Sequence, residues 1–449
     1  MNNNVNKTVV RFAPSPTGFL HLGSARTAIF NYLFVKQNKG KFILRIEDTD
    51  KERSKKEYED DIVNSLNWLG IKFDESFKQS ERGAIYKKYL NKLIDEGKAY
   101  VSKESGVLEA GARNEVIRFK NPNKKVIFND MIRGEIEFDT TELKDFVIAK
   151  SLEEPLFHLA VVVDDFEMGV THIIRGEDHI SNTPRQILIQ EAIGAPKPNY
   201  AHIPLILDKD RSKLSKRKHG ERVSLSHYEK KGYLPIAMVN YLSLLGWNPG
   251  TPQEIFTMEE LIGQFDIGKI QKGGAIFNED KLKWVNKEHM KMLPADKIAD
   301  EFQKIISRHY SAEISFVKKL LPAIQDRISS FGDVEDMIKA EELGYFFNKP
   351  DYESVSLKWK GDTDIEVSRT HLNYILSALE SIPEDLFTID NLRSVLFGYA
   401  EEKGKGSVLW PLRFALSGKD RSPNPFALMS ILGKKETMDR VKIALQKMQ

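Results

Sequence analysis

Cysteine is absent from the 449 residues of this chain. Disulfide bonds and thiolate-bound metal sites are therefore excluded, which fits a reducing compartment and favours the cytoplasm. No apolar stretch approaches the ~20 consecutive residues that a membrane-spanning helix needs. The polar, Asn-rich start of the chain also lacks the apolar core of a signal peptide. We therefore expect a cytoplasmic protein that does not enter a membrane.

A large excess of charge of one sign is also missing. Lysine and arginine total 67 against 65 aspartate and glutamate residues, so the formal net charge is +2. Any contact with RNA must then use local basic patches rather than the charge of the whole molecule. The length leaves room for two or more domains with substantial cores.

One turn near the start of the chain carries the first chemical signal. Residues 8–12 predict a short strand, and the apolar spacing of residues 25–33 predicts a helix after a proline-containing turn. His21 and Gly23 then fall at the start of the helix, where unpaired N–H groups favour an anion. From this stretch alone two interpretations stay open: a nucleotide phosphate site, or a structural turn capped by Ser24.

A second signal lies far downstream, in the basic loop of residues 208–222. Its segment Lys-Leu-Ser-Lys-Arg, residues 213–217, would by itself be read as solvated surface. An HxG helix start followed by a KxSK loop is, however, the two-part signature of class I aminoacyl-tRNA synthetases. The chain resembles the bacterial glutamyl-tRNA synthetase family, whose motifs occur in the same order at residues 14–27, 44–50, 161–165, 175–186, 213–217 and 240–247.

The resemblance implies an α/β fold with several parts. The expected division is a Rossmann-like parallel-sheet catalytic domain at residues 1–240, with an α+β insertion at about 83–190 that binds the tRNA acceptor end. A stem-contact region at 241–325 and an all-α anticodon-binding domain at 326–449 follow. The strand–helix–strand order of residues 8–47 fits the opening of such a parallel sheet.

Two local predictions are made from periodicity alone. The continuous apolar run Leu159–Val163 predicts a buried strand. Helical spacing at residues 302–306, 317–321 and 324–328 predicts helices, and Pro322 is expected to separate the last two.

The resemblance also implies a reaction without a covalent enzyme intermediate. Glutamate would attack ATP, which carries Mg²⁺, to give glutamyl-adenylate, and the 3′ end of tRNA(Glu) would then accept the glutamyl group. The resemblance assigns His21, Lys213 and Lys216 to catalysis, Gly23, Ser24, Ser215, Lys216 and Arg217 to ATP, and Arg11, Ser15, Glu47 and Arg175 to glutamate.

Structural alternatives to two of these roles stay open. Arg175 could instead form an internal ion pair with Asp164, Asp165 or Glu177. Glu47 could likewise pair with Arg45 or Arg11. Arginine remains the natural partner of a substrate carboxylate, because its guanidinium can bind both oxygens.

The sequence departs from the family pattern at two places. The family usually has tyrosine at the position of Phe157, so one hydroxyl is missing on the substrate side. Some members carry a zinc-binding knuckle after the position of Tyr100, but residues 101–106 contain neither cysteine nor histidine. We therefore expect no zinc.

The expected partners are L-glutamate and tRNA(Glu), with a monomeric enzyme; whether tRNA(Gln) is also charged stays open. Alternatives are a glutaminyl-tRNA synthetase, which usually has a β-barrel anticodon domain, and a non-catalytic tRNA-binding paralogue. The aromatic residues Tyr233, Tyr241 and Trp247 could stack on RNA, but their helical spacing favours a place in the core.

Overall fold

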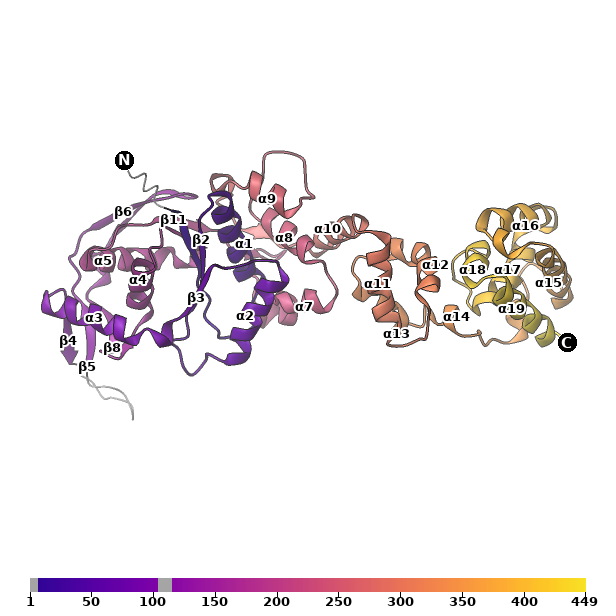
Figure 1. Ribbon diagram of the computed structural model, residues 1–449, viewed down its shortest axis with the longest axis horizontal. Coiled ribbons are helices and arrows are strands. Elements are labelled where there is room, and N and C mark those ends of the chain that lie inside the picture. Colours follow the sequence, from indigo (N-terminus) through magenta and orange to yellow (C-terminus); the bar gives the residue numbers. More distant parts are fainter. Residues whose placement is uncertain (1–6, 104–114) are drawn as a thin grey trace. The chain divides into compact units, whose positions relative to one another are not determined.

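The chain is described by a computed structural model at residues 7–103 and 115–449, with Lys216 and Arg217 described by their backbone alone. It divides into two compact units, Met1–His289 and Met290–Gln449. Figure 1 follows the chain through both units by colour.

The first unit is built on a seven-stranded sheet. In order across the sheet its strands are β3 (Glu75–Lys78), β2 (Lys41–Ile46), β1 (Val9–Phe12), β10 (His172–Gly176), β11 (Asn199–Ile203), β6 (Lys125–Asp130) and β7 (Gly134–Asp139). Neighbouring strands are parallel except β6 and β7, which form an antiparallel hairpin at one edge. Parallel neighbours need crossover connections, and helices follow β1, β2 and β10. The expected α/β class with a Rossmann-like sheet is confirmed.

The register of this sheet brings three of the expected site residues to one edge. Arg11 of β1 lies opposite Ile43 of β2, and Arg175 of β10 lies opposite His202 of β11. Glu47 directly follows the last residue of β2. Because the carboxyl ends of parallel strands share an edge, these side chains can meet a common ligand there.

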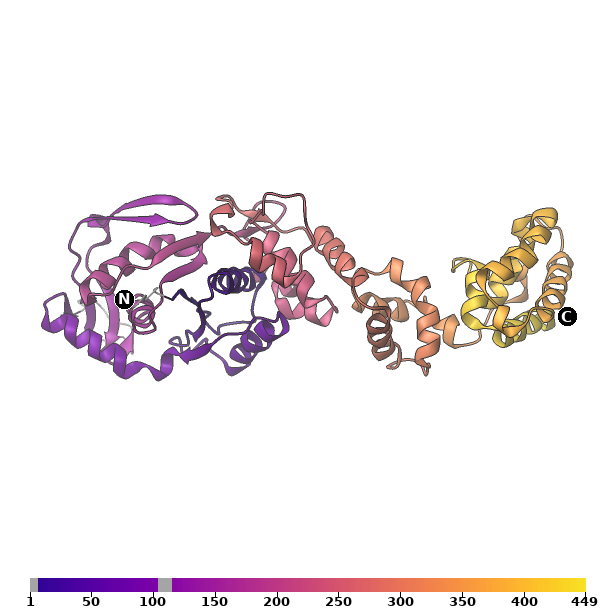
Figure 2. The ribbon, with the colours of Figure 1, turned by 45° about the horizontal axis from the view of Figure 1, so that its top comes forward.

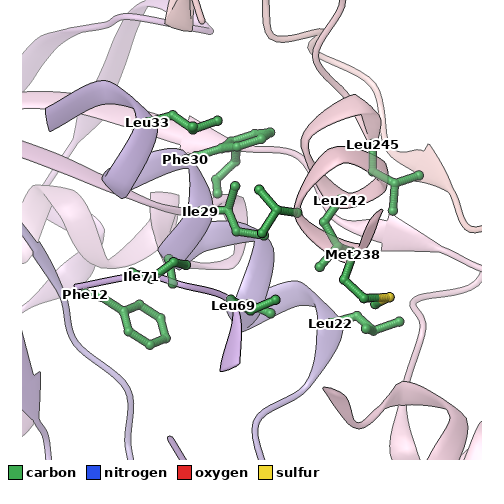
Figure 3. Packing of buried hydrophobic residues seen from close by; sticks show 14 of the residues in the cluster. Phe12, Leu22, Ile29, Phe30, Leu33, Leu69, Ile71, Met238, Leu242 and Leu245 are labelled. Atoms are coloured by element: carbon green, nitrogen blue, oxygen red, sulfur yellow. The ribbon is translucent and has the colours of Figure 1, made fainter. Parts of the chain in front are cut away.

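Helix α1 (Leu22–Gln37) is buried on almost all sides. It packs on the sheet and also against α8 (Pro235–Leu244), and Figure 3 shows Ile29 of α1 facing Leu242 of α8. A helix held between two layers needs apolar side chains all round rather than one apolar stripe. The other helices of this unit are α2 (Lys56–Trp68), α3 (Gly83–Asp95), α4 (Phe157–Glu167), α5 (Thr183–Ile193), α6 (Lys216–His219), α7 (Leu225–Lys230) and α9 (Met258–Gln264), and α10 (Glu279–Lys291) follows them.

A second, antiparallel sheet lies within the region expected to form the insertion. Its strands are β4 (Ala99–Lys103), β5 (Glu115–Phe119), β8 (Phe146–Ser151) and β9 (Glu154–Pro155). The hairpin of β6 and β7 comes from the same stretch of sequence but joins the large sheet beside β11. This region therefore contributes strands to both sheets.

The run Leu159–Val163 is not a strand, so that prediction was wrong. It forms the middle of α4, all five of its side chains are buried, and the helix packs on α5. A helix surrounded by protein has the same continuous apolar sequence as a buried strand, so periodicity could not distinguish the two. As a result, Asp164 and Asp165 extend from a helix into the interior.

Residues 290–449 are described throughout and contain helices but no strand (Figure 2). Pro322 lies inside one of these helices, so the predicted break is wrong. Val317, Leu320 and Ile324 of the same helix are buried, and their burial helps to offset the hydrogen bond that proline removes. The helices are α11 (Ala295–Ile306), α12 (Ile314–Ile324), α13 (Gly332–Lys339), α14 (Gly344–Phe347), α15 (Ile365–Glu380), α16 (Ile389–Lys403), α17 (Lys405–Ser417), α18 (Pro425–Leu432) and α19 (Lys434–Lys447).

Within the described residues, no helix has both the length and the apolar character needed to cross a membrane.

Candidate active site

A cavity of about 460 Å³ lies at the carboxyl edge of the large sheet. The turn after β1, the start of α1, the ends of β2 and β10, the start of α4 and the hairpin after β11 all contribute to its walls. Nine of the residues expected at the site line it: Arg11, Ser15, His21, Gly23, Ser24, Glu47, Arg175, Lys213 and Ser215. Phe157 lines it as well. Two chain segments that are far apart in the sequence thus contribute to one space.

His21, rather than Ser24, caps helix α1. Its Nδ1 accepts a hydrogen bond from the backbone N–H of Ser24 at 3.1 Å, and the helix begins at Leu22. A Cβ atom on Gly23 would lie 3.1 Å from this same Nδ1, so glycine leaves room for the imidazole ring. The first turn of α1 therefore faces the cavity, and its N-terminal end favours negative charge there.

The lysine segment returns to the cavity through a tight hairpin. Strand β12 (Ile206–Leu207) pairs with β13 (Ala275–Ile276), and Leu207 also bridges to Lys213. Nζ of Lys213 lies 3.2 Å from Oδ2 of Asp178, and both side chains are about half exposed.

The backbone of Lys216 and Arg217 opens α6 just after this hairpin. Their side chains lie outside the described part of the chain, so their predicted contacts with ATP stay predictions.

A second wall of the cavity, which includes Arg11 and Glu47, is backed by a buried network of charges. Arg45 is fully buried and lies 2.6 Å from Asp165, 3.1 Å from Glu47 and 3.8 Å from Asp164. Nε of Arg11 donates to Asp165 at 3.1 Å. The alternative pairing of Glu47 with a neighbouring arginine is therefore present.

Opposing effects set the pKa values in this network. Burial alone would raise the pKa of Asp165, but Arg11 and Arg45 outweigh it and hold that pKa below its ordinary value. For Glu47 the balance is reversed: burial raises its pKa although Arg45 and Arg11 act in the opposite direction. The network thus favours a charged Asp165 more strongly than a charged Glu47.

Unlike Arg11 and Arg45, Arg175 forms no ion pair with any described carboxylate. Its Nε donates to Nε2 of His202 at 3.1 Å, and its Nη2 donates to Oγ1 of Thr183 at 2.8 Å. Burial and the nearby charge of Arg11 lower its pKa to about 10. A guanidinium that is 6% exposed and bonded only to neutral groups is well suited to an anion from outside the chain.

The proposed internal partners of Arg175 are engaged elsewhere. Asp164 pairs with Arg82 at 2.6 Å as well as with Arg45, and Glu177 pairs with Arg133. The alternative of an internal ion pair for Arg175 is therefore not realised among the described residues.

Several participants were missed or misplaced by sequence reasoning. Asp165 was considered only as a partner of Arg175 and Arg45 only as a partner of Glu47, and His179, which lines the cavity, was not singled out. Burial and the nearby Arg175 lower the pKa of His179 to about 4, so this ring is neutral at pH 7. The sequence did carry a signal for Asp165, because two acidic residues follow an apolar run there. A carboxylate next to such a buried run requires a charged partner.

The three aromatic residues weighed as RNA contacts are core residues. Tyr233, Tyr241 and Trp247 are at most 5% exposed. Among the described residues, no group of three or more histidine, aspartate and glutamate side chains could hold a metal ion. Half of the segment weighed for zinc, residues 104–106 of 101–106, lies outside the described residues, so the expectation of no zinc stays a prediction.

Comparisons with known proteins agree along the whole chain. The catalytic domain described as "tRNA synthetases class I (E and Q)" matches residues 7–109 and 106–284, and an anticodon binding domain matches residues 297–445. A glutamate–tRNA ligase of Aquifex aeolicus (strain VF5) is 40% identical over 482 aligned positions, which cover 99% of this chain and 100% of that protein.

Two further comparisons point the same way. A glutamate–tRNA ligase of Sulfurihydrogenibium sp. (strain YO3AOP1) is 39% identical and covers 98% of each chain. The crystal structure of a glutamate tRNA ligase from Elizabethkingia meningosepticum CCUG26117, in complex with its amino acid, superposes with a TM-score of 0.87 at 31% identity. It covers 99% of this chain and 100% of its own.

Proposed function

The chain belongs to the family of class I tRNA synthetases for glutamate and glutamine, and we propose that the cavity at its sheet edge binds glutamate and ATP side by side. Its activity is ATP-dependent ligation of glutamate to tRNA, a step of protein biosynthesis. In the first step a carboxylate oxygen of glutamate attacks the α-phosphorus of ATP, and pyrophosphate leaves. In the second step the terminal ribose hydroxyl of tRNA attacks the mixed anhydride, AMP leaves and the hydroxyl proton is released.

The net charge of glutamate complements the net charge of the buried wall. The ion-pair network around Arg45 and the neighbouring Arg175 together contain four guanidinium groups, those of Arg11, Arg45, Arg82 and Arg175. Only three carboxylates, those of Glu47, Asp164 and Asp165, oppose them, so one positive charge is left over. Free glutamate carries two carboxylates and one ammonium group and would cancel that excess.

The guanidinium of Arg175 is the single observation that carries this assignment. It lines the cavity, it is buried, and neutral groups hold it. We assign Arg175 and Arg11 to the glutamate carboxylates, Glu47 to the ammonium group and Ser15 to an additional hydrogen bond. An uncharged analogue would leave a buried guanidinium without its partner, which disfavours it strongly.

ATP would occupy the side of the cavity formed by the helix start and the lysine hairpin. His21, Gly23 and Ser24 face the α-phosphate and ribose, since helix N-termini attract anions. Lys213 and Ser215 face the β- and γ-phosphates, together with Lys216 and Arg217 from the sequence motif. Charge moves onto the leaving pyrophosphate in the transition state, and positioned cations stabilise it there.

Mg²⁺ would enter bound to ATP, held mainly by phosphate oxygens and water. The described residues offer no cluster of three ligands for a resident metal, which supports treating MgATP as the substrate. We further propose a zinc-free, monomeric, cytoplasmic enzyme. The division at residues 1–240, 241–325 and 326–449, with the acceptor-binding insertion at about 83–190, is part of the same proposal.

Aminoacylation of purified tRNA(Glu) and tRNA(Gln), with glutamate and glutamine offered separately, tests the proposal. We expect transfer of glutamate to tRNA(Glu) and no transfer of glutamine. Transfer of glutamine to tRNA(Gln) would instead identify a glutaminyl-tRNA synthetase. Tight tRNA binding without any aminoacylation would identify a non-catalytic paralogue. Charging of tRNA(Gln) with glutamate would add a second acceptor.

A further inference from the structure

Two side chains that do not line the cavity, those of His202 and Asp130, form a chain of hydrogen bonds that ends at Arg175. Nε of Arg175 donates to Nε2 of His202 at 3.1 Å, and Nδ1 of His202 lies 2.7 Å from Oδ2 of Asp130. The exposed fractions of Arg175, His202 and Asp130 are 6%, 0% and 2%. Asp130 is the last residue of β6, so the hairpin of β6 and β7 reaches the cavity wall through this chain of hydrogen bonds.

These contacts permit only one arrangement of protons on His202. A carboxylate at Asp130 only accepts hydrogen bonds, so Nδ1 of His202 must carry a proton. Arg175 only donates, so Nε2 of His202 must be free to accept. Burial lowers the pKa of His202, so the ring is neutral and meets both requirements as the Nδ1–H tautomer.

Two further contacts fix the orientations of Arg175 and His202. Nη2 of Arg175 donates to Oγ1 of Thr183 at 2.8 Å, which gives the guanidinium a second fixed point. The ring of His202 stacks on Tyr200, with an interplanar angle of 7°. Neither ring nor guanidinium can turn away without losing one of these contacts.

We propose that Asp130 is a positioning residue for glutamate: it fixes the tautomer of His202, which holds Arg175 in the orientation that receives a substrate carboxylate. The inference rests on the proposed function, since it takes Arg175 to be a glutamate contact. Asp130 acts only through these neighbours, because it is not among the residues that line the cavity.

The substitution Asp130→Asn should reverse the tautomer with little change in shape. Oδ1 of Asp130 accepts from the backbone N–H groups of Ile132 and Arg133 at 3.0 and 2.9 Å. The backbone N–H of His202 lies 3.4 Å from Oδ1 and 3.1 Å from Oδ2, so it can bond to either oxygen. An amide oxygen in the place of Oδ1 keeps all three backbone donors within reach, so the amide NH₂ would take the place of Oδ2 and donate to Nδ1 of His202. Nε2 would then carry the proton and face the N–H of Arg175, where two donors repel.

Kinetics and spectroscopy together test the proposal. In glutamate-dependent ATP–pyrophosphate exchange with tRNA(Glu) present, D130N should raise the KM for glutamate about 10- to 100-fold, because a hydrogen bond to a charged group is lost. The kcat should stay within about threefold, since the transferred groups are not touched. The matched control D139N alters an exposed carboxylate of the same hairpin, which bonds only to Thr141, and should leave both constants unchanged.

Imidazole ¹⁵N chemical shifts report the tautomer directly, without substrate. In the wild-type protein, His202 should show the Nδ1–H form, and D130N should shift it to the Nε2–H form; the variant H202Q assigns the signal by its loss. A wild-type ring in the Nε2–H form would overturn the proposal even if D130N fails to fold.

The double variant separates positioning from a general structural role. Glutamine at position 202 can present its carbonyl oxygen to Arg175 without any tautomer. In the H202Q background, D130N should therefore change the KM for glutamate by less than about threefold. An equal rise in both backgrounds would contradict the proposal. Failure of the wild-type enzyme to charge tRNA with glutamate would refute the proposed function instead, since the tautomer does not depend on substrate.

Discussion

The two walls of the cavity are built in opposite ways. The charged wall around Arg45 is buried, and each of its carboxylates already contacts at least one guanidinium. The lysine hairpin on the other side is exposed, and Lys213 is paired only with the half-exposed Asp178. Buried charges keep their positions because moving one leaves another unpaired, whereas exposed pairs exchange with water at little cost.

This difference matches two different tasks. Selecting one small amino acid requires fixed partners whose mismatch is costly, and in the proposed function the buried wall would provide them. Triphosphate must enter, react and leave as pyrophosphate, which requires cations that can change partners. We therefore expect substitutions in the buried wall to affect stability and glutamate binding, and substitutions in the hairpin to affect the phosphate chemistry.

The largest expected difference between the walls is in stability. Asp165→Asn should lower the free energy of unfolding by about 3–5 kcal/mol, because Arg11 and Arg45 lose a buried partner. Asp178→Asn, in the hairpin pair, should cost less than about 1 kcal/mol. Urea unfolding at pH 7 measures both, and equal losses would remove the distinction between the walls.

The stability from Asp165 should also depend on pH. Its pKa in the folded protein is below the ordinary value of 3.8. The contribution is therefore complete above that value and is lost as the pH falls through the folded-state pKa. The difference between wild type and Asp165→Asn should accordingly shrink in acid.

Arg175→Met should lower kcat/KM for glutamate by about 100- to 1,000-fold, because a charged contact to a substrate carboxylate is lost in a buried site. The KM for ATP should change little. Steady-state ATP–pyrophosphate exchange measures both constants. Arg53→Met, at a surface arginine that is paired with Asp50, is the control and should behave as wild type. Unchanged glutamate kinetics in Arg175→Met would remove Arg175 from the site.

Lys213→Ala should slow pyrophosphate exchange at saturating substrates by about 10- to 100-fold, since one cation that stabilises the leaving phosphates is lost. The KM for glutamate should stay within about twofold of wild type. Lys209→Ala removes an exposed lysine of the same hairpin and serves as the matched control. A large rise in the glutamate KM would show that the hairpin does not act on phosphate alone.

The smallest expected effect is at Phe157. Phe157→Tyr restores the hydroxyl that is usual in the family, on a ring that lines the cavity. One added hydrogen bond should lower the KM for glutamate about three- to tenfold. An unchanged or higher KM would show that the hydroxyl does not reach the substrate.

Sequence reasoning succeeded where the site depends on local order along the chain. The strand that contains Arg11 and the helix start at His21 were both predicted from local patterns, and parallel topology brings strand ends to one edge. It failed for Asp165, because an apolar run did not reveal that the carboxylate belongs to a buried helix rather than following a strand.

The pairing of Asp130 with His202 could not be predicted for a different reason. It depends on β6 joining the large sheet beside β11, a contact between distant parts of the sequence. Neither residue belongs to a turn, cap or periodic pattern that would link it to the other. Their role becomes visible only when the folded sheet brings them within 2.7 Å.

The central claim is that the two walls enclose one site for both substrates. Calorimetric titration with a non-hydrolysable glutamyl-adenylate analogue tests this most directly. We predict that one molecule binds per chain, that glutamate and ATP each compete with it, and that Arg175→Met weakens its binding. An analogue that binds without displacing ATP would contradict the account, because the hairpin and the buried wall would then serve separate sites.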